Sequence, residues 1–331
     1  MDTIRRYQSE EGLKILGDPT RGQILRLLIS RPATLSQLGE QLQKHPAQIR
    51  HHLKIMENFG MVELETVKTT KNYTEKFYRA TAKAFFVNLA FFPAPGAAGQ
   101  IVVLGSDDLA LNLLRDFVNQ QDNTPDLIIL PVGSLDGLIF LRENYCQISG
   151  SHLYDFESGV YNIHYVQNLF SDRKMVLVTL SHRELGMLIK KGNPKNIHSL
   201  EDLTRKGIRF INRNRGAGTR FWLDQNLRQR NIDAADIEGY ERMVHTHQAV
   251  AEAIRSEQAD VGIGMYSIAR LNDLDFIPLV EERYDLVMPA DFYHSSIFQP
   301  ILQIICSTEF KQQVSALGGY RVTDTGQVIE I

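Results

Sequence analysis

The chain has 331 residues, 43% of them hydrophobic and 23% charged, which is a length and composition for about two globular domains. No apolar run approaches the ~20 residues that a membrane-spanning helix needs, and the first residues, MDTIRRYQSEEG, lack the apolar region of a secretory signal. The two cysteines, Cys146 and Cys306, lie far apart and look unpaired. These features predict a cytoplasmic protein without membrane contact.

Charge is divided unevenly along the chain. Residues 1–92 hold 14 Lys and Arg against 9 Asp and Glu, a net charge of +5, and the remainder holds 22 against 30, a net charge of −8. A basic N-terminal part suits the phosphate backbone of DNA, and its binding is expected to weaken steeply with salt. The acidic remainder is not expected to bind DNA on its own.

The N-terminal part shows the element order of a winged helix-turn-helix. Residues 13–30 are typical of two packed helices, Leu35–Leu42 of a third, and a further helix begins at Pro46, where a missing N–H is tolerated. A strand is predicted over Met61–Thr66, followed by a polar tip and a return strand that includes Phe77 and Tyr78. Helices followed by a two-stranded hairpin predict an α+β winged helix-turn-helix DNA-binding domain.

The helix that begins at Pro46 has two different faces. Ile49, Leu53 and Met56 recur at helical intervals and are expected to face the core. Its other face, the preceding turn and the hairpin tip carry basic and polar side chains that can reach base edges and phosphates in a major groove. The predicted DNA-binding residues are Lys44, His45, Gln48, Arg50, His51, His52, Lys54, Lys68 and Lys71. The predicted partner is a double-stranded DNA operator.

The segments GDPTRGQILRLL and IRHHLKIME, with the helix-turn-helix between them, resemble the ArsR family of winged-helix repressors over about residues 10–80. The resemblance implies a homodimer on a near-palindromic operator. Metal-sensing members of that family carry cysteines in the helix that here reads TLSQLGEQL, which has none. A metal site is therefore not expected in this domain.

A linker is predicted after the winged helix-turn-helix. Residues 93–99, PAPGAAG, are small, uncharged and rich in Pro and Gly. The apolar stretch before them, from Ala80 to Phe92, is expected to form a helix packed against the head or a dimer mate. The predicted domains are thus a DNA-binding domain over 1–92, the linker, and a ligand-binding domain over 100–331.

From residue 100 onward, apolar strands alternate with helices. Strand runs at Ile101–Leu104, Leu127–Pro131 and Ile208–Asn212 are each followed by a turn of small polar residues and a helix. This alternation predicts a mostly parallel α/β sheet, in which ligands gather at the carboxyl ends of strands beside helix N-termini. The three turns together predict a site for an anion or a carboxylate, although Ser and Asp before a helix can also act simply as N-caps.

The segments GSLDGL, ISGSHLYD, RELGMLIKKGNP and INRNRGAGTRFWLDQNL, followed by HQAVAEAI and ADVGIG, resemble periplasmic-binding-protein-type domains. The most similar are their cytoplasmic, molybdate-binding-protein-like versions. The resemblance runs from about Gly105 to Gly264 and implies a type II fold, two α/β lobes with the ligand between them. Lobe I would take residues 100–180 and 285–331, and lobe II residues 190–275.

Carried over turn by turn, this resemblance implies ligand-binding residues from both lobes. They are Ser106, Asp107, Ser134, His152, Asn162, Arg213, Arg215, Gly218, Thr219, Arg220, His247 and Tyr266. Arginines beside a glycine-rich turn supply charge for an anion, although one of them can instead pair with a nearby carboxylate. The resemblance points to an oxyanion such as molybdate or tungstate as the effector, and the arginines would equally suit an organic carboxylate or a phosphate.

The sequence shows no catalytic constellation. It contains no GxxxxGK[ST], HExxH or CxxC, GSLDG is not GxSxG, and GAGTRF lacks the third glycine of GxGxxG. No catalytic residue, metal or cofactor is expected. The predicted function is a ligand-responsive transcriptional regulator that binds a small-molecule effector. The alternative is a cytoplasmic small-molecule or oxyanion-binding protein whose head serves dimerisation.

Overall fold

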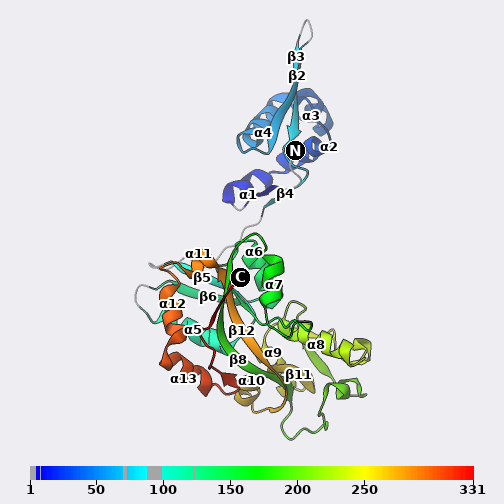
Figure 1. Cartoon of the computed structure of the whole chain (residues 1–331). Helices are drawn as coiled ribbons and strands as arrows, with labels where there is room; N and C mark the ends of the chain where they lie inside the picture. The colour runs from blue at the N-terminus through cyan, green and yellow to red at the C-terminus, as the bar shows by residue number, and fades with distance from the viewer. Residues whose placement is uncertain (1–4, 8, 70–72, 88–98, 122–123) are drawn as a thin grey trace. The chain divides into compact units, whose positions relative to one another are not determined.

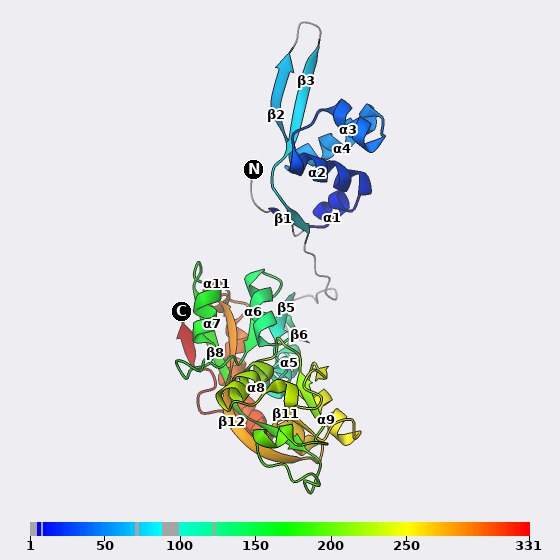
Figure 2. The same ribbon diagram turned by 90° about the vertical axis from the view of Figure 1, so that its right-hand side faces the viewer.

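The computed structural model describes residues 5–7, 9–69, 73–87, 99–121 and 124–331. The chain separates into two compact units, residues 1–93 and 94–331, which we call the head and the body (Figures 1 and 2). Within the described ranges, none of the helices has the length and apolar character needed to cross a lipid bilayer.

The head is a winged helix-turn-helix. Its helices and hairpin strands are α1 (Glu10–Leu16), α2 (Pro19–Ser30), α3 (Leu35–Leu42), α4 (Pro46–Asn58), β2 (Val62–Thr69) and β3 (Thr74–Ala80). Asp18 and Thr34 cap α2 and α3 by accepting hydrogen bonds from backbone N–H groups of the first turn. Ile49, Leu53 and Met56 are at most 2% exposed, which confirms the predicted inner face of α4.

The segment after the hairpin differs from the prediction. Phe85–Val87 forms a strand, β4, that pairs in parallel with β1 (Arg5–Tyr7). The predicted helix from Ala80 to Phe92 is therefore wrong over its described part, and residues 88–92 lie outside the described residues. Tyr7 packs against the Phe59 and Phe85 rings, with centroid distances of 4.9 and 6.5 Å. This packing, which the local sequence does not reveal, favours the strand.

The body is built on a ten-stranded sheet with the main order β10-β9-β11-β8-β12-β7-β5-β6, in which β13 and β14 pair with β8. The strands are β5 (Gln100–Gly105), β6 (Asp126–Pro131), β7 (Ile148–Ser151), β8 (Met175–Ile189), β9 (Phe210–Arg213), β10 (Met243–Val244), β11 (Val261–Met265), β12 (Asp275–Pro289), β13 (Tyr320–Arg321) and β14 (Val328–Glu330). Parallel pairs occur toward both ends of the sheet, whereas β8 and β12 are antiparallel to each other and to their neighbours. The sheet is thus mixed, which corrects the expectation of a mostly parallel one.

Helices cover the sheet at both ends. They are α5 (Leu109–Asn119), α6 (Ser134–Arg142), α7 (Ile163–Leu169), α8 (Gly218–Gln229), α9 (His247–Arg255), α10 (Tyr266–Leu271), α11 (Ala290–Tyr293), α12 (Gln299–Cys306) and α13 (Thr308–Ala316), with short 3-10 turns η1 (Leu200–Thr204) and η2 (Ala234–Asp236). In Figure 1, α12 and α13 lie beside α5, and α8 and α9 lie toward β11.

Separate apolar cores define two lobes in the body. The core of the first lobe includes Ile101, Leu114 and Phe298, and that of the second includes Phe210 and Trp222. The long strands β8 and β12 contribute side chains to both cores, so they connect the lobes. We call residues 181–184 of β8 and 281–284 of β12 the crossing. Register shifts in the β8–β12 pairing lie on either side of the crossing.

Candidate functional site

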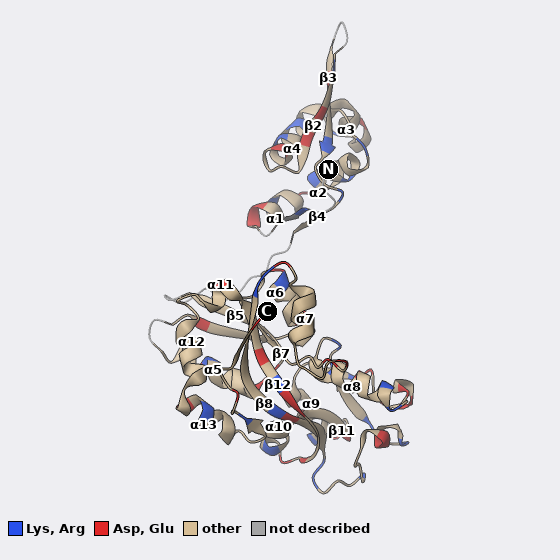
Figure 3. Ribbon diagram, in the orientation of Figure 1, with Lys and Arg blue, Asp and Glu red and all other residues tan. Residues whose placement is uncertain are grey.

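Buried polar side chains gather where the two lobes meet, and we call them the interlobe cluster. Its members come from both lobes and from the crossing: Ser106, Asp107, Ser134 and His152 of the first lobe, Arg213, Gly218, Thr219 and His247 of the second, and Arg183 and Glu282 of the crossing. All are buried except Asp107, which is partly exposed. Figure 3 shows charged residues midway along β8 and β12, between the ends that pack into the two lobes.

His152 lies at the centre of the cluster. Its Nε2 is 2.9 Å from Ser106 Oγ, its Nδ1 is 3.1 Å from Glu282 Oε1, and its backbone N–H donates to Ser134 Oγ over 3.2 Å. Helix α8 of the second lobe begins against the same ring, because a Cβ added to Gly218 would lie 2.7 Å from His152 Cε1. His152 therefore contacts groups of the first lobe, the second lobe and the crossing.

Backbone groups also join the lobes directly. The N–H of Leu135 donates to the carbonyl of Gly216 over 3.2 Å, and the N–H of His247 donates to Asp107 Oδ2 over 3.3 Å. Asn214 Nδ2 donates to the carbonyl of Val132 over 3.3 Å. These contacts place the lobes in a closed arrangement around the interlobe cluster.

Three helices begin at this cluster. α6 begins at Ser134 and α8 at Gly218, and neither N-terminus is capped by a side-chain hydrogen bond. α9 begins at His247, whose N–H points to the Asp107 carboxylate. Helix N-termini carry partial positive charge and free N–H groups, so this arrangement favours a negatively charged group.

Several buried polar atoms of the cluster have no hydrogen-bond partner among the described residues. They are Nε and Nη1 of Arg213, Nη2 of Arg183, Oγ1 of Thr219 and both ring nitrogens of His247. Buried polar atoms nearly always have a partner, so unpartnered ones need an explanation. Most of these atoms are N–H or O–H donors, which suits a ligand rich in acceptor oxygens.

Burial sets the ionisation of the cluster. It lowers the pKa of Arg213 to about 10, although the nearby Asp107 favours the charged form. Burial raises the pKa of Asp107, against the effect of Arg213, and lowers the pKa of His152 and of His247, so that both histidines are neutral at pH 7. Burial also acts to raise the pKa of Glu282, but His152 and Arg183 outweigh it, so that carboxylate stays ionised.

Arg215 and Arg220, predicted as ligand-binding residues, lie outside the cluster. Arg215 is exposed, and its guanidinium is 3.3 Å from a Glu241 carboxylate oxygen at the surface. Arg220 is buried but donates to Asp224 Oδ1 over 2.9 Å and lies 4.0 Å from the centre of the Tyr240 ring. Both arginines therefore interact within the second lobe, and Arg213 is the arginine of this turn that reaches the cluster.

Asn162 and Tyr266 also have local roles. Asn162 accepts a hydrogen bond from the N–H of Leu153 and donates to the carbonyl of Ser151 and to Asp285, so it fixes the chain between β7 and α7. Tyr266 begins α10 and packs its ring against Phe276, with a centroid distance of 5.3 Å. The other eight predicted ligand residues belong to the interlobe cluster.

Two charged members of the cluster, Arg183 and Glu282, were not predicted from the sequence. Their positions pair with each other across β8 and β12, and Arg183 Nε lies 3.2 Å from Glu282 Oε2. Arg183 Nη1 also donates to Asp108 Oδ2 over 2.6 Å. The available signal was Arg183, next to Glu184 in the otherwise mainly apolar strand MVLVTLSHRELGMLI, where burial of a charge requires a partner.

The predicted DNA-binding residues do not all lie on one face of the head. Gln48, Arg50, His51 and Lys54 of α4 are exposed, as is Lys68 of β2. A groove of about 570 Å³ between α4 and β3 is lined by polar side chains that include Arg50, Lys54 and Lys76. The head thus presents basic side chains along one helix and beside its wing.

The remaining predicted DNA-binding residues differ from these. His45 is exposed but caps α4, because its Nδ1 accepts from the N–H of Ala47 over 3.2 Å. Lys44 and His52 are half-buried, and burial lowers the pKa of His52 against the effect of the nearby Asp18. Lys71 lies outside the described residues.

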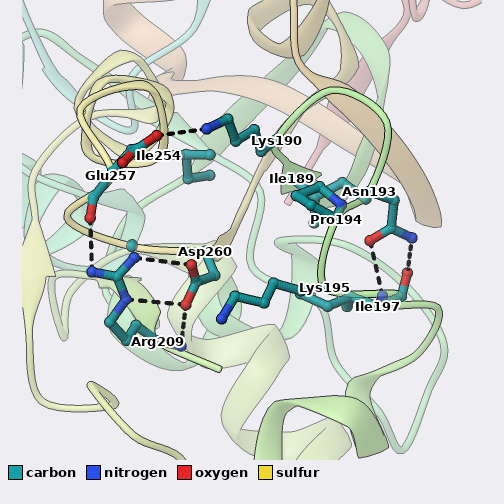
Figure 4. Close-up of a pocket in the computed structure, with 11 residues that line it drawn as sticks. Ile189, Lys190, Asn193, Pro194, Lys195, Ile197, Arg209, Ile254, Glu257 and Asp260 are labelled. Atoms are coloured by element: carbon teal, nitrogen blue, oxygen red, sulfur yellow. Dashed lines mark hydrogen bonds and ion pairs between the residues drawn. The ribbon is translucent and has the colours of Figure 1, made fainter. Parts of the chain in front are cut away.

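A separate pocket of about 280 Å³ lies in the second lobe (Figure 4). Its polar side chains pair with one another: Lys190 Nζ lies 2.6 Å from Glu257 Oε1, and Arg209 Nη2 lies 2.9 Å from Asp260 Oδ1. None of its lining atoms is among the described buried atoms that lack a partner. The interlobe cluster is therefore the stronger candidate for a ligand site.

The Gly218→Ala substitution should weaken ligand binding by roughly tenfold or more, since the new methyl group would overlap the His152 ring and hold the lobes apart. The folding stability of each lobe should change little, because the clash arises only on closure. Calorimetric titration and a melting curve test this prediction. The matched control is Gly22→Ala on α2, where an added Cβ meets nothing within 4 Å. Unchanged ligand affinity in Gly218→Ala would show that the close approach of Gly218 to His152 is not needed for ligand binding.

Comparisons with known proteins agree with both units. Residues 116–306, more than half of the chain, match the family described as PBP superfamily domain. Residues 18–63 match the family described as bacterial regulatory protein, arsR family. The uncharacterized protein YvgK of Bacillus subtilis (strain 168) is 36% identical over 229 residues, which cover 69% of this chain and 73% of that protein.

Other similarities are shorter or more remote. An uncharacterized Clostridium pasteurianum protein, from the 5' region of a ferredoxin 2Fe-2S gene, is 36% identical over 108 residues, which cover 32% of this chain and 96% of that protein. The tungstate ABC transporter structure from Geobacter sulfurreducens is 12% identical, covers 67% of this chain and 100% of its own, and has a TM-score of 0.49. An ABC-type phosphate transport receptor from Vibrio cholerae is 16% identical, covers 67% and 99%, and has a TM-score of 0.45.

The two family matches are to a DNA-binding regulator and to a solute-binding domain, which are non-enzymatic kinds of protein. Their combination in one chain supports a ligand-responsive regulator in general. The chain belongs to the PBP superfamily through its body and carries an ArsR-family DNA-binding head.

Proposed function

We propose that the interlobe cluster binds a small oxyanion of the molybdate or tungstate kind, and that this binding changes the affinity of the head for an operator. The observation that carries the proposal is Arg213. Arg213 is 1% exposed, two of its nitrogens have no hydrogen-bond partner among the described residues, and it lies close enough to Asp107 of the first lobe for the two charges to interact. A buried cation with free donors gains most from an anion.

The shape of the donor set supports an oxyanion. Nε and Nη1 of Arg213 present free N–H groups on different sides of the guanidinium, and Nη2 between them donates to the carbonyl of His245 over 2.8 Å. The Thr219 hydroxyl and the uncapped N-termini of α6 and α8 add donors from other directions. Donors that come from several elements suit a compact anion with several oxygens.

An organic carboxylate or a phosphorylated metabolite is the second candidate. Arg213 by itself would bind either group, because carboxylate and phosphate oxygens accept from a guanidinium in the same paired geometry. The two candidates differ in what they require beyond the anionic group, since an organic ligand needs additional room for its carbon skeleton.

The signal would reach DNA through a change in the body that is transmitted to the head. A ligand shifts the balance between open and closed lobes in proportion to its preference for the closed form. We further propose that the head acts in a homodimer, so that closure changes the spacing of two α4 helices on an operator. The exposed Arg50, His51 and Lys54 of α4 are the groups proposed to contact it.

A thermal-shift screen of the full chain tests the ligand. Tungstate, molybdate, phosphate and a set of small carboxylates are each added in excess. A ligand at a hundred times its Kd stabilises the folded protein by about 2.7 kcal/mol, which raises the melting temperature measurably. A shift with tungstate or molybdate is expected. A shift with organic acids alone would show that the ligand is an organic carboxylate and not an oxyanion of this kind. No shift with any anion would contradict the proposed site.

DNA binding by the head should depend strongly on salt. Because basic side chains displace counterions from the phosphates, the logarithm of the affinity should fall linearly with the logarithm of the salt concentration, by about 0.9 per phosphate contact. Fluorescence anisotropy with a labelled duplex between low and moderate salt gives the slope. A head that served only for dimerisation would show no salt-dependent binding to duplex DNA.

A further inference from the structure

The charges buried around His152 do not balance once an anion is added. Asp108 and Glu282 share the single guanidinium of Arg183, with N–O distances of 2.6 and 3.2 Å. Asp107 and Arg213 influence each other across the lobe interface and offset each other in charge. When Asp108, which lies outside the defined cluster but contacts Arg183, is counted with its charged members and the histidines are neutral, one negative charge is in excess, and a bound oxyanion would add at least one more.

The helix N-termini offset only part of that excess. Each contributes roughly half a positive charge, which is screened and directional. A buried site with a remaining negative charge gains from taking up a proton, because burial disfavours uncompensated charge. The cluster therefore needs a proton acceptor near the anion.

His152 has the contacts of such an acceptor. The ionised Glu282 accepts a hydrogen bond from Nδ1–H, so in the neutral ring Nε2 is left to accept from the Ser106 hydroxyl. When Nε2 is also protonated, it can donate to Ser106 Oγ over the same 2.9 Å. The Ser106 O–H then becomes free to turn toward an anion, and both ring N–H groups keep an acceptor.

His247 is less suited to receive the proton. Both its ring nitrogens lack a partner among the described residues, and no carboxylate acts to raise its pKa. Burial lowers the pKa of His247, and the positive charges of Arg213 and Arg183 lower it further. In His152, by contrast, Glu282 counteracts burial.

We propose that Glu282, acting from the crossing, makes His152 the proton acceptor of the interlobe cluster, so that an oxyanion is bound together with one proton. Glu282 is in this view a positioning residue, since it acts on the ligand through His152 and Ser106. The inference rests on the proposed oxyanion function and adds that ligand binding changes the charge next to the Arg183–Glu282 pair of the crossing.

The groups that face His152 come from every element around it. They are Ser106 after β5, Ser134 of α6, Arg183 of β8, Arg213 of β9, Gly218 of α8, His247 of α9, and Glu282 and Tyr284 of β12, whose Tyr284 ring stacks on His152 at 6.0 Å. In the free protein, burial outweighs Glu282 and lowers the pKa of His152. A bound anion would raise the pKa of His152 again. The affinity for the anion should therefore fall by about tenfold per pH unit as pH rises from the pKa of His152 in the free protein to its pKa in the anion-bound protein.

The test is calorimetric titration of the full chain with sodium tungstate, in two buffers of different ionisation enthalpy at the same pH. Tungstate carries no proton near neutral pH, so any proton taken up goes to the protein. Uptake of about one proton per anion is expected. Tungstate binding without proton uptake would overturn this inference and leave the proposed function intact, whereas no tungstate binding would overturn both.

Two substitutions test whether His152 is the residue that takes up the proton. Glu282→Gln should retain tungstate binding but reduce proton uptake toward zero and flatten the pH profile, effects that a purely structural role would not produce. Glu281→Gln is the matched control, because Glu281 pairs with Arg321 at the surface; its proton uptake should equal that of the unsubstituted protein. If Glu282→Gln does not fold, His152→Asn provides the same test, and full proton uptake in either folded variant would contradict the proposal.

Discussion

Arg213→Met should reduce oxyanion affinity by more than about a hundredfold and should also lower the stability of the unliganded protein. The loss follows from removing the charged donor pair, since truncating a buried charge-assisted contact costs on the order of 2–5 kcal/mol. Burial lowers the pKa of Arg213 to about 10, so its charged form gains from a bound anion. Removing Arg213 also leaves the partly buried Asp107 without the positive charge that offsets it, so the unliganded protein should lose stability.

Titration calorimetry and a melting curve on the same protein separate these two effects. Arg215→Met is the matched control, because it removes the same charge two residues away from an exposed position. Its oxyanion affinity should stay within about threefold of the unsubstituted protein, as is usual for exposed side chains that do not touch the ligand. Equal losses of affinity in the two variants would show that the total positive charge of the second lobe, and not a contact from Arg213, attracts the anion.

Arg50→Ala combined with His51→Ala should reduce operator affinity by about a hundredfold and leave oxyanion affinity unchanged. Both side chains are exposed on α4, so their removal should change folding stability by less than about 0.5 kcal/mol. Each side chain that contacts a base edge contributes on the order of 1–3 kcal/mol to discrimination, which gives the expected combined loss. Fluorescence anisotropy with a duplex selected from a random pool measures it.

The control for this pair removes comparable side chains from the body. Lys195→Ala with Arg215→Ala deletes two exposed cations of the second lobe, and operator affinity should not change. If both double variants weakened DNA binding to the same extent, the contact would depend on total charge, and α4 would not be the recognition helix.

The head could be predicted from sequence because its signals are local. Pro46 and the spacing of Ile49, Leu53 and Met56 identify α4, and all three apolar side chains are buried as expected. The exception is the segment around Phe85, where an apolar run is compatible with a helix or a strand. Its pairing with β1, some 80 residues earlier, decides between them, and pairing over that separation leaves no local pattern.

The interlobe cluster could be predicted in part. Turns rich in Ser, Gly and Asp identified Ser106, Ser134 and Gly218. Small polar residues and glycine are preferred at helix N-termini, and this preference can be read from the local sequence. The direction of each arginine after β9 was not predictable from that rule. Arg213 ends the strand and points into the cluster, whereas Arg215 and Arg220 interact with acidic side chains of their own lobe.

Arg183 and Glu282 required the tertiary structure. They lie about a hundred residues apart and become neighbours only because β8 and β12 run antiparallel through the crossing. A single sequence shows Arg183 beside Glu184 and Glu282 within the run EERYD, without indicating which charged residues are buried or which pair with each other. The proton-linked role of His152 likewise depends on contacts from three separate parts of the chain.

The central claim is that a ligand in the body controls DNA binding by the head. It is tested most directly by the affinity of the full chain for its selected duplex, measured with and without saturating tungstate at constant salt and pH. The account predicts that the two affinities differ by about fivefold or more, the usual range of coupling between linked sites. Equal affinities, with tungstate shown to be bound, would contradict it.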